Sequence, residues 1–387
     1  MKKTLRDYSF YGKTVIVRCD LNVPMNGDKI LDDTRIVASL DTINYLINDN
    51  AKVIVLSHLG KIKTEDDIKN NSLYPVYLRL CQLLKCRCYF SKELRGIELE
   101  KKINDMNYGE VLLLENTRYL DLPDKLESGC SDEISKYWAG LGDVFVNDAY
   151  GTCHRAHASN VGIAKYLPNA LGFLVENEVN KLSSIMNENT HPFVVIMGGK
   201  KISDKTLVID NLVKKCDKIL LGGGMCFTFL KAKGINVGNS IVDDDNLDYC
   251  KKILDSYKSK IFLPVDVIIQ DGRIKNIKEL RDTDTGYDIG PETIKLFCSE
   301  LKNSKRVIIN GPMGMYEDSK FANGTVELYN YLKNNKIKTL IGGGDSAASV
   351  NELGFNDVFY HVSTGGGATL EFLSGKNLPG IDIINEK

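Results

Sequence analysis

Five times in the second half of this chain, a short apolar run stops at a cluster of glycines. Such runs, alternating with longer amphipathic stretches, predict a parallel α/β sheet, in which ligands bind outside the carboxyl ends of the strands. Glycine at a strand end permits a positive φ and lets bare N–H groups approach an anion. Tight turns alone can also require glycine, but the repetition favours a nucleotide or phosphate site. The clusters are Gly198–Gly199, Gly222–Gly224, Gly311 with Gly314, Gly342–Gly344 and Gly365–Gly367.

The apolar runs of the first half end instead in basic, amide and acidic side chains. Each such residue alone is typical of a solvated surface. Their repetition at the sheet edge where ligands bind is what points to a site. They are Arg18, Asp20, Asn22, Ser57, His58, Lys61, Glu115, Asn116, Arg118, Asn147, Asp148, His154, Arg155 and His157.

Arg35 stands in the first turn of a predicted helix, which Asp32 or Asp33 can cap. The helix dipole disfavours a cation at this end, and a bound anion would remove the conflict. A solvent-facing arginine without a role is the alternative. The helix is predicted because Ile36, Leu40, Ile43 and Ile47 fall on one face.

The length of 387 residues exceeds the roughly 250–300 at which single cores usually split, so two domains are expected. Pro168 closes the first half, and Gly172 precedes a helix predicted from about Phe173 to Met186. We therefore expect an N-terminal domain over 1–170, a connecting helix over 171–186 and a C-terminal domain over 187–371.

Composition excludes several classes of function. The net charge of −1 gives no global attraction for nucleic acid or anionic membranes. No apolar stretch approaches the 18 residues of a membrane span, and the basic start reaches Asp7 before any apolar run. We expect a cytoplasmic protein whose ten cysteines are reduced thiols. Cys81, Cys86 and Cys88 cluster, but their spacing fits no standard zinc pattern.

The glycine clusters complete none of the common nucleotide motifs. No Gly-Lys pair belongs to a Walker A loop, and the GGGDSA segment beginning at Gly342 lacks the acidic residue that a dinucleotide fingerprint needs about 20 positions later. The protein-kinase H-R-D and D-F-G motifs are also absent.

Taken together, the two sets of strand ends resemble phosphoglycerate kinases along essentially the whole chain. The order and spacing of the motifs make the resemblance specific. They read RCDLNVP (18–24), DDTRI (32–36), SHLGK (57–61), ENTRY (115–119), GTCHRAHAS (151–159), GGKKISDK (198–205), GGGM (222–225), NGPMGMYE (310–317), GGGDS (342–346) and STGGGATLE (363–371).

The resemblance implies two doubly wound parallel-sheet (Rossmann-like) domains that face a central cleft, with the tail at about 372–387 docking back on the first. It implies 3-phosphoglycerate on the N-terminal domain and Mg-ATP or Mg-ADP on the C-terminal one. The reaction would be reversible transfer of a phosphoryl group between 1,3-bisphosphoglycerate and ADP, in glycolysis and gluconeogenesis, by a monomer whose domains close around the substrates.

Carried over position by position, the resemblance also implies site residues. The glycerate-phosphate site would comprise Asp20, Leu21, Asn22, Arg35, His58, Leu59, Gly60, Lys61, Arg118 and Arg155. The nucleotide site would comprise Gly198, Gly199, Lys201, Lys205, Gly222, Gly223, Asn310, Pro312, Glu317, Gly342, Gly343, Gly344, Asp345 and Ser346, with Asp345 as the magnesium contact. Arg35, Lys201, Gly344 and Gly367 would stabilise the moving phosphoryl group.

This chemistry needs no general base, because a carboxylate nucleophile is already ionised at neutral pH. The chain departs from the family at a few positions. Lys61-Ile62 replaces the usual Arg-Pro, and a lysine cannot grip a phosphate bidentately. Lys200 replaces a small residue and is expected to face solvent. Cys19 and Cys153 replace apolar residues and are expected to pack in the core.

Two other functions are open from the residues alone. A dinucleotide-dependent dehydrogenase would also have glycine-ended strands, but it would need the missing ribose-binding acid. A non-catalytic nucleotide-binding homologue would have no need of Arg35, His58, Arg118 and Arg155 at one edge.

Overall fold

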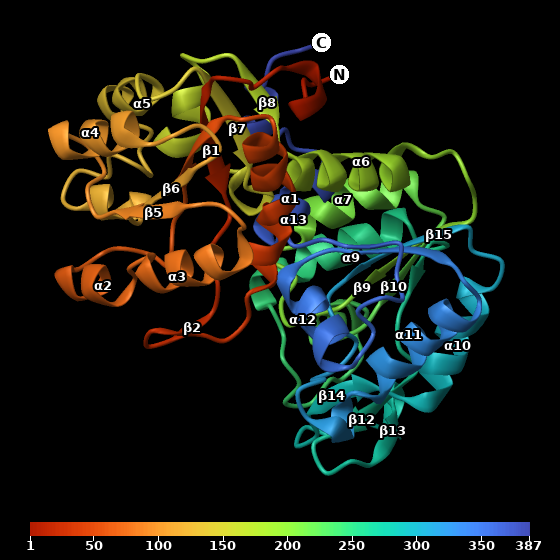
Figure 1. Cartoon of the computed structure of the whole chain (residues 1–387). Coiled ribbons are helices and arrows are strands. Elements are labelled where there is room, and N and C mark those ends of the chain that lie inside the picture. The colour runs from red at the N-terminus through yellow and green to blue at the C-terminus, as the bar shows by residue number, and fades with distance from the viewer. The chain divides into compact units, whose positions relative to one another are not determined.

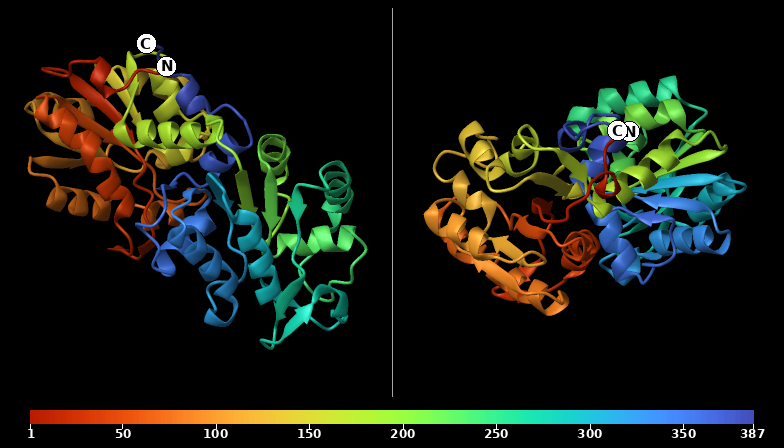
Figure 2. Two further views of the ribbon diagram at one scale, coloured as in Figure 1. Left: turned by 90° about the vertical axis from the view of Figure 1, so that its right-hand side faces the viewer. Right: turned by 45° about the horizontal axis from the view of Figure 1, so that its top comes forward.

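The computed structural model describes all residues from 1 to 387, and the chain divides into two compact units (Figures 1 and 2). Unit 1 comprises Met1–Asn180 and Asn377–Lys387, and unit 2 comprises Lys181–Lys376. The boundary falls inside the helix α6 (Phe173–Asn187), in the region where the sequence predicts a connecting helix.

Unit 1 is built on a six-stranded sheet with the order β5-β6-β4-β1-β7-β8, in which every pairing is parallel. The strands are β1 (Thr14–Cys19), β4 (Lys52–Leu56), β5 (Cys88–Ser91), β6 (Val111–Leu114), β7 (Val144–Asp148) and β8 (Asn169–Leu171). The other elements are the hairpin β2 (Met25–Asn26) and β3 (Lys29–Ile30), and the helices α1 (Thr34–Asn48), α2 (Glu65–Asn70), α3 (Tyr74–Leu83), α4 (Ile97–Asp105), α5 (Asp132–Ala139) and α14 (Pro379–Asp382).

The sheet of unit 1 is buried on both faces by helices. Successive side chains of a strand point to opposite sides and so enter two different cores. Val15 and Val17 of β1 belong to a core that α1 and α3 cover. Ile16 of the same strand belongs to a second core, which α4 and α5 cover. Arg18 follows Ile16 on that second face. Continuous apolar strands of this kind are typical of parallel sheets between two helical layers.

Unit 2 repeats the plan with a parallel six-stranded sheet of order β11-β10-β9-β15-β16-β17. An antiparallel sheet of order β13-β12-β14 is added to it. The strands are β9 (Phe193–Met197), β10 (Lys218–Leu221), β11 (Ile261–Phe262), β12 (Asp266–Ile269), β13 (Ile274–Asn276), β14 (Gly286–Ile289), β15 (Arg306–Asn310), β16 (Lys338–Ile341) and β17 (His361–Val362). The helices are α7 (Thr206–Lys215), α8 (Met225–Ala232), α9 (Leu247–Ser256), α10 (Pro291–Leu301), α11 (Asn323–Asn334), α12 (Gly344–Glu352) and α13 (Gly367–Leu373).

The five glycine clusters follow β9, β10, β15, β16 and β17, so all five lie at the carboxyl edge of one parallel sheet, as the sequence predicts. Below this edge, α10, α11 and α12 close a core against one face of the sheet. The predicted α/β architecture with parallel sheets in both halves is therefore confirmed.

The last residues of the chain pack within unit 1. The Asn147 side chain donates to the Gly380 carbonyl oxygen at 2.8 Å, and the Asn385 N–H donates to the Asn169 side chain at 2.7 Å. Lys2 forms an isolated antiparallel bridge with Glu386, so the two ends of the chain lie side by side, as both views of Figure 2 show.

Candidate functional site

The carboxyl ends of β1, β4, β6 and β7 bring the polar residues of unit 1 to one sheet edge. Arg18 of β1 lies in register between Leu56 of β4 and Asn147 of β7, and β6 pairs with the far side of β4. The predicted site residues 20–22, 58–61 and 118 follow these strands directly. The order of the strands in the sheet, β6-β4-β1-β7, thus brings three separate segments of the chain to one edge.

Arg35 pairs with Asp20 at this edge. Its Nη1 lies 2.8 Å from both carboxylate oxygens of Asp20, which is buried while Arg35 is half-exposed. Arg35 is the second residue of α1, as predicted, but the anion that offsets the helix dipole is an internal carboxylate. The helix dipole therefore does not by itself call for a bound anion at Arg35.

The start of α1 distinguishes between the two aspartates that the sequence offers as caps. Asp33 occupies the N-cap position but makes no capping bond, because its carboxylate accepts from Arg79 Nε at 2.8 Å. Asp32 accepts the Thr34 N–H at 2.8 Å instead.

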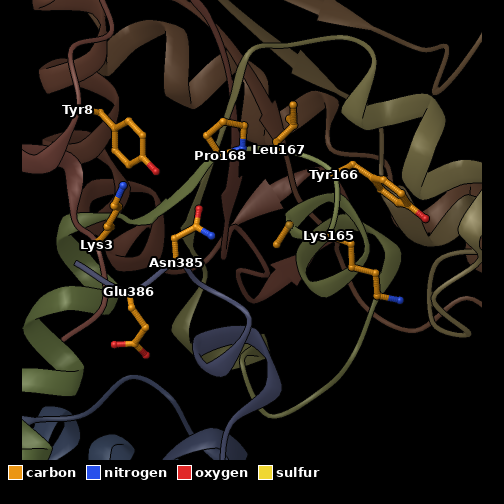
Figure 3. Close-up of a pocket in the computed structure, with 9 residues that line it drawn as sticks. Lys3, Tyr8, Lys165, Tyr166, Leu167, Pro168, Asn385 and Glu386 are labelled. Atoms are coloured by element: carbon orange, nitrogen blue, oxygen red, sulfur yellow. The ribbon is translucent and has the colours of Figure 1, made fainter.

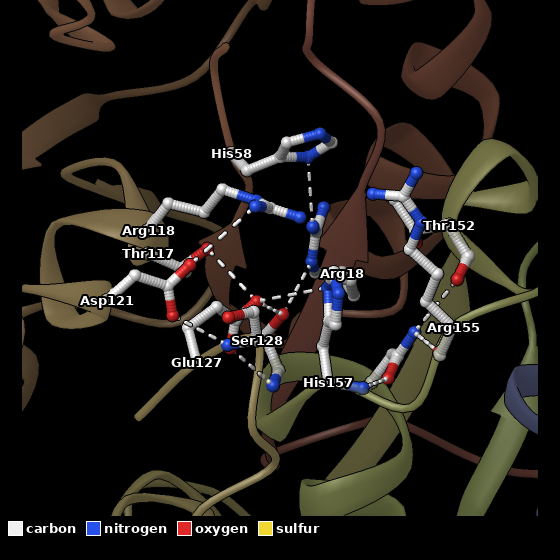
Figure 4. A network of polar contacts seen from close by, with 12 residues as sticks. Arg18, His58, Thr117, Arg118, Asp121, Glu127, Ser128, Thr152, Arg155 and His157 are labelled. Atoms are coloured by element: carbon white, nitrogen blue, oxygen red, sulfur yellow. Dashed lines mark hydrogen bonds and ion pairs between the residues drawn. The ribbon is translucent and has the colours of Figure 1, made fainter. Parts of the chain in front are cut away.

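A buried polar network lies behind the edge (Figure 4). Arg18 is fully buried; its Nε donates to Ser159 Oγ at 2.8 Å and its Nη2 lies 3.1 Å from His58 Nδ1. Ser159 Oγ donates in turn to the buried carboxylate of Glu127. Burial lowers the pKa of Arg18 and raises that of Glu127, while the attraction between the two charges opposes both shifts.

Two histidines beside this network are held neutral. Burial and the nearby Arg18 and Arg118 depress the pKa of His58 well below its usual range. Burial and the same arginines lower the pKa of His157 to about 3. The positive charge of the edge therefore comes from its arginines.

The guanidinium of Arg118 has an N–H donor that makes no hydrogen bond within the protein. Its side chain is 10% exposed, its Nη1 lies 3.6 Å from Asp121 Oδ2, and its buried Nε has no hydrogen-bond partner. Buried donors are usually satisfied, so this group is suited to an oxyanion ligand. Arg155 is exposed, and its Nε donates to His154 Nε2 at 3.0 Å.

The remaining predicted glycerate-site residues differ in whether the side chain or only the main chain is accessible to a ligand. Leu21 and Leu59 are core residues, so only their main chains could meet a ligand. Asn22 Oδ1 accepts the Gly60 N–H at 2.9 Å and joins the loops after β1 and β4. Lys61 is exposed.

Several polar strand ends of unit 1 serve the fold. Glu115 accepts the Leu73 N–H at 2.7 Å, and Asn116 donates to the Leu59 carbonyl oxygen at 2.7 Å. Asp148 Oδ1 accepts the Leu174 N–H at 2.9 Å at the start of α6. These bonds explain polar residues at strand ends without a ligand.

In unit 2 the first three glycine clusters pack backbone against backbone. A Cβ on Gly198 would lie 2.0 Å from the Pro312 carbonyl oxygen, and one on Gly223 would lie 2.5 Å from the Gly199 nitrogen. The N–H of Gly199 donates to the Pro312 carbonyl oxygen at 2.9 Å. Close approach of neighbouring strand ends therefore requires several of these glycines, whereas the sequence interpretation gave that role to an anion.

Lys205 and Asn310 join the ends of β9, β15 and β16. Lys205 Nζ donates to the Gly198 carbonyl oxygen at 2.8 Å and to Asn310 Oδ1 at 2.7 Å, while Asn310 Nδ2 donates to the Gly342 carbonyl oxygen at 2.7 Å. Burial lowers the pKa of Lys205 to about 8, against the attraction of Asp345 and Asp204.

The helix α12 begins where β16 ends, and its first turn is open to solvent. Gly343 has φ +98°, Gly344 and Asp345 are exposed, and nothing lies within 4 Å of a Cβ built on Gly344. The first N–H groups of a helix have no intrahelical partners and favour anions. Ser346 is buried and its Oγ accepts the Gly311 N–H, so it serves the fold.

The other predicted nucleotide-site residues lie around this edge. Lys201, Glu317 and Gly367 are exposed, and Lys200 is exposed as predicted. Gly222 is buried against Met313, whose Sδ would lie 2.4 Å from an added Cβ. Cys19 and Cys153 are buried, in agreement with a packing role, and all ten cysteines are free thiols.

The residues of the predicted nucleotide site could bind a magnesium ion only together with a phosphate ligand and water. No group of three or more histidine, cysteine or acidic side chains could hold a metal ion. Asp345 alone offers an exposed carboxylate at the predicted place. This fits Mg²⁺, which is commonly bound by one or two carboxylates together with substrate phosphates and water.

A surface hollow of about 600 Å³ lies elsewhere, between Lys3, Tyr8, Lys165 and Glu386 (Figure 3). It marks the place where the two ends of the chain meet and contains none of the predicted site residues. Separately, no helix combines the length and apolarity needed to cross a membrane.

The sequence interpretation counted Arg18 among the polar strand ends but gave it no individual role, and it did not consider Glu127. An arginine inside the apolar run of β1 was the available signal, because an unpaired charge in a buried strand is costly. Glu127 lies in an irregular segment, and nothing in its sequence neighbourhood indicates that it is buried.

Comparison with known proteins agrees with the architecture over the whole chain. A model of the phosphoglycerate kinase family matches residues 5–376. The phosphoglycerate kinases of Enterococcus faecalis and Fusobacterium nucleatum are 48% and 50% identical to the chain, and each alignment covers 100% of both proteins. The structure of phosphoglycerate kinase from Coxiella burnetii, 34% identical, superposes with a TM-score of 0.88 and covers 99% of this chain and 98% of its own. The chain belongs to the phosphoglycerate kinase family.

Proposed function

We propose that this protein catalyses the reversible, magnesium-dependent transfer of a phosphoryl group between 1,3-bisphosphoglycerate and ADP, giving 3-phosphoglycerate and ATP. Unit 1 binds the glycerate substrate and unit 2 binds the nucleotide. The observation that carries the proposal is the convergence of Arg18, Arg35, His58 and Arg118 at one edge of unit 1, where Arg118 Nε is buried without a partner.

On unit 1, the arginines neutralise the phosphate and carboxylate of the glycerate. Arg118 uses its free donor, and Arg155 and Lys61 approach from the exposed rim. Arg35 exchanges part of its pairing with Asp20 for the transferring phosphoryl group. Asn22, Gly60 and the main chains of Leu21 and Leu59 shape the loops around the ligand.

On unit 2, Lys205 and the first turn of α12 receive the nucleotide phosphates. Asp345 would hold Mg²⁺, which neutralises charge on the phosphate oxygens when it is bound. The adenosine lies against the glycine clusters at 198–199 and 222–223, with Asn310, Pro312 and Glu317 beside it.

The chemical step depends on positioning and charge stabilisation. The attacking carboxylate is ionised at neutral pH, so the protein need not remove a proton. Lys201 and Arg35 contact the equatorial oxygens, and the N–H groups of Gly344 and Gly367 assist them. Because the ligands belong to different units, turnover requires the units to bring them together and exclude water. We expect a cytoplasmic monomer, as is usual for the family.

A coupled assay with 3-phosphoglycerate, ATP and Mg²⁺ tests this function. Formation of ADP that depends on all three components supports it. Folded protein that binds ATP without turnover would make the chain a non-catalytic homologue, and turnover of reduced nicotinamide would favour a dehydrogenase instead.

The neighbouring lysines 200 and 201 give a matched test of the chemical step, since both are exposed. Lys201→Ala should lower kcat by at least about 100-fold, by analogy with the loss of one donor to a developing negative charge. Lys200→Ala should change kcat by less than about threefold, since a lone surface substitution usually has little effect. Steady-state kinetics at saturating substrates decides; equal effects of the two variants would remove the role given to Lys201.

A further inference from the structure

The contact between Arg18 and His58 fixes more than the place of the imidazole ring. Arg18 Nη2 lies 3.1 Å from His58 Nδ1, and Arg18 is fully buried in β1. A guanidinium has donors only and stays protonated in proteins. A hydrogen bond at this distance therefore requires His58 Nδ1 to be the acceptor. The proton of a neutral imidazole must then sit on Nε2.

Arg18 is itself held in place by groups that admit little freedom. Its Nε donates to Ser159 Oγ at 2.8 Å, and its Nη1 donates to the Cys19 carbonyl oxygen. Ser159 is fixed by Glu127, whose Oε2 accepts the Ser159 N–H at 2.9 Å and whose Oε1 accepts from Thr117 Oγ1 at 3.2 Å. The network in Figure 4 thus aims one guanidinium nitrogen at one ring nitrogen.

The charges that face His58 oppose its protonation. They come from Arg18 of β1, Arg118 of the short 3-10 helix η2 (Thr117–Asp121) and Arg35 of α1. His157 also faces His58, but it is itself neutral near pH 7 because its pKa is about 3. Burial acts in the same direction, and together these groups depress the pKa of His58 well below its usual range. Protonation would also place a second N–H opposite Arg18 Nη2 and break the only bond between the two side chains.

We propose that Arg18 is a positioning residue that holds His58 as the neutral tautomer with its proton on Nε2, so that His58 is a directional donor to the glycerate substrate and not one of its cations. The identity of the acceptor on the substrate rests on the proposed function; the tautomer does not. In this arrangement Arg18 acts through His58, and the charge that meets the substrate comes from Arg35, Arg118, Arg155 and Lys61.

The test is ¹⁵N NMR of the histidine side chains in the full-length enzyme without substrate. The spectrum of His58 should show a protonated Nε2 and an unprotonated Nδ1, unchanged from pH 8 to pH 5.5. A His58 that titrates near its ordinary value of about 6.5, or that carries its proton on Nδ1, would overturn the proposal. This result is independent of whether the protein turns over any substrate.

Three variants distinguish the effect of the Arg18–His58 hydrogen bond from the effect of the surrounding positive charge. Arg18→Met removes the donor and should let His58 populate both tautomers and titrate at higher pH. Arg18→Lys keeps a donor and a charge and should restore the Nε2–H form. Arg118→Met removes a neighbouring charge only, so it should raise the pKa of His58 without changing its tautomer. If Arg18→Met leaves the tautomer unchanged in folded protein, another group sets it and the proposal fails.

Steady-state kinetics of the Arg18 variants distinguishes loss of positioning from loss of folding. Loss of one oriented hydrogen bond should raise the KM for 3-phosphoglycerate about tenfold in Arg18→Met, with the KM for ATP unchanged. Arg18→Lys should recover most of this loss. Equal changes in both KM values would indicate a general structural defect and would contradict a role through His58.

Discussion

At Gly198 the backbone of one strand end lies directly against that of another. At Gly198 the Pro312 carbonyl oxygen occupies the space that a Cβ would need, whereas nothing lies within 4 Å of a Cβ built on Gly344. Both residues stand in glycine clusters after strands of one sheet. At the scale of single residues, the clusters therefore contain two kinds of glycine, one required by packing and one available to a ligand.

Alanine substitutions should separate the two kinds. Gly198→Ala should destabilise unit 2 by about 1–3 kcal/mol or more, because a Cβ at 2.0 Å from a carbonyl oxygen forces the backbones apart. Gly344→Ala should leave the thermal unfolding midpoint within a few degrees and should act on nucleotide affinity and turnover instead. Calorimetric unfolding and nucleotide titration measure both effects. Equal stability of the two variants would show that the strand ends can separate freely.

Lys205 should couple nucleotide binding to proton uptake. Its pKa of about 8 in the free protein lies below the ordinary 10.5, so above pH 8 the side chain is mostly neutral. A bound phosphate favours the charged form, and binding at pH 9 should take up nearly one proton at this site. At pH 6.5 the uptake at Lys205 should be near zero, because the lysine is already charged.

Isothermal titration calorimetry in buffers of different ionisation enthalpy measures this uptake. Lys205→Met is the control and should abolish the difference between the two pH values. An uptake that persists in Lys205→Met would assign the proton to another group.

The sequence could predict which residues gather at the two sheet edges but not how they pair. The carboxyl ends of the strands in a parallel sheet lie at one edge. The grouping of Asp20, His58 and Arg118 at that edge could therefore be predicted from their positions after the strands. The pairing of Arg35 with Asp20 and the burial of Glu127 arise from tertiary packing, which local patterns do not contain. The roles of individual site residues remain predictions.

At the scale of elements, the start of α6 is fixed by side chains of unit 1. The Phe173 N–H donates to Thr42 Oγ1 at 2.9 Å and the Leu174 N–H to Asp148 Oδ1 at 2.9 Å. Gly172 is required, because its Cβ would lie 2.2 Å from Asp148 Oδ1. Gly172 indicates the start of this helix in the sequence, but the capping partners Thr42 and Asp148 are not apparent there.

Asp148 should make the stability of unit 1 depend on pH. Burial raises its pKa from 3.8 to about 7, so between these values the folded state binds a proton that the unfolded state has lost. Stability from this group is complete below about pH 4 and is lost as the pH rises through 7, by up to about 4 kcal/mol. Asp148→Asn should therefore flatten the decline between about pH 4 and pH 7.

Urea unfolding at several pH values measures this effect. Asp28→Asn, which changes an exposed carboxylate, serves as the control and should leave the wild-type slope intact. A steeper decline in Asp148→Asn would mean that the carboxylate is charged in the folded protein.

At the scale of the whole molecule, unit 1 is assembled from both ends of the chain. The tail contributes the buried residues Leu378, Ile381 and Ile384, and its backbone and side chains bond to Asn147 and Asn169. The two parallel sheets were predictable because their apolar strands are long and regular. The partner of the tail had to come from family resemblance, since its composition carries no pattern.

Deletion of residues 377–387 should destabilise unit 1 selectively. Burial of three aliphatic side chains contributes about 1.5–3 kcal/mol each, so a loss of several kcal/mol is expected. Removing only Glu386 and Lys387, which are exposed, should cost far less. Hydrogen exchange followed by mass spectrometry reports the two units separately. Equal loss of protection in unit 2 would contradict an effect confined to unit 1.

The return of the tail to unit 1 also sets an order of events during synthesis. All of unit 2, from Lys181 to Lys376, lies within the sequence of unit 1. On a ribosome, unit 2 has its complete sequence before the last eleven residues of unit 1, Asn377–Lys387, have been added. Until those residues have been added, Asn169 of β8 lacks its contact with the tail. In this protein the carboxy-terminal unit can finish folding before the amino-terminal one.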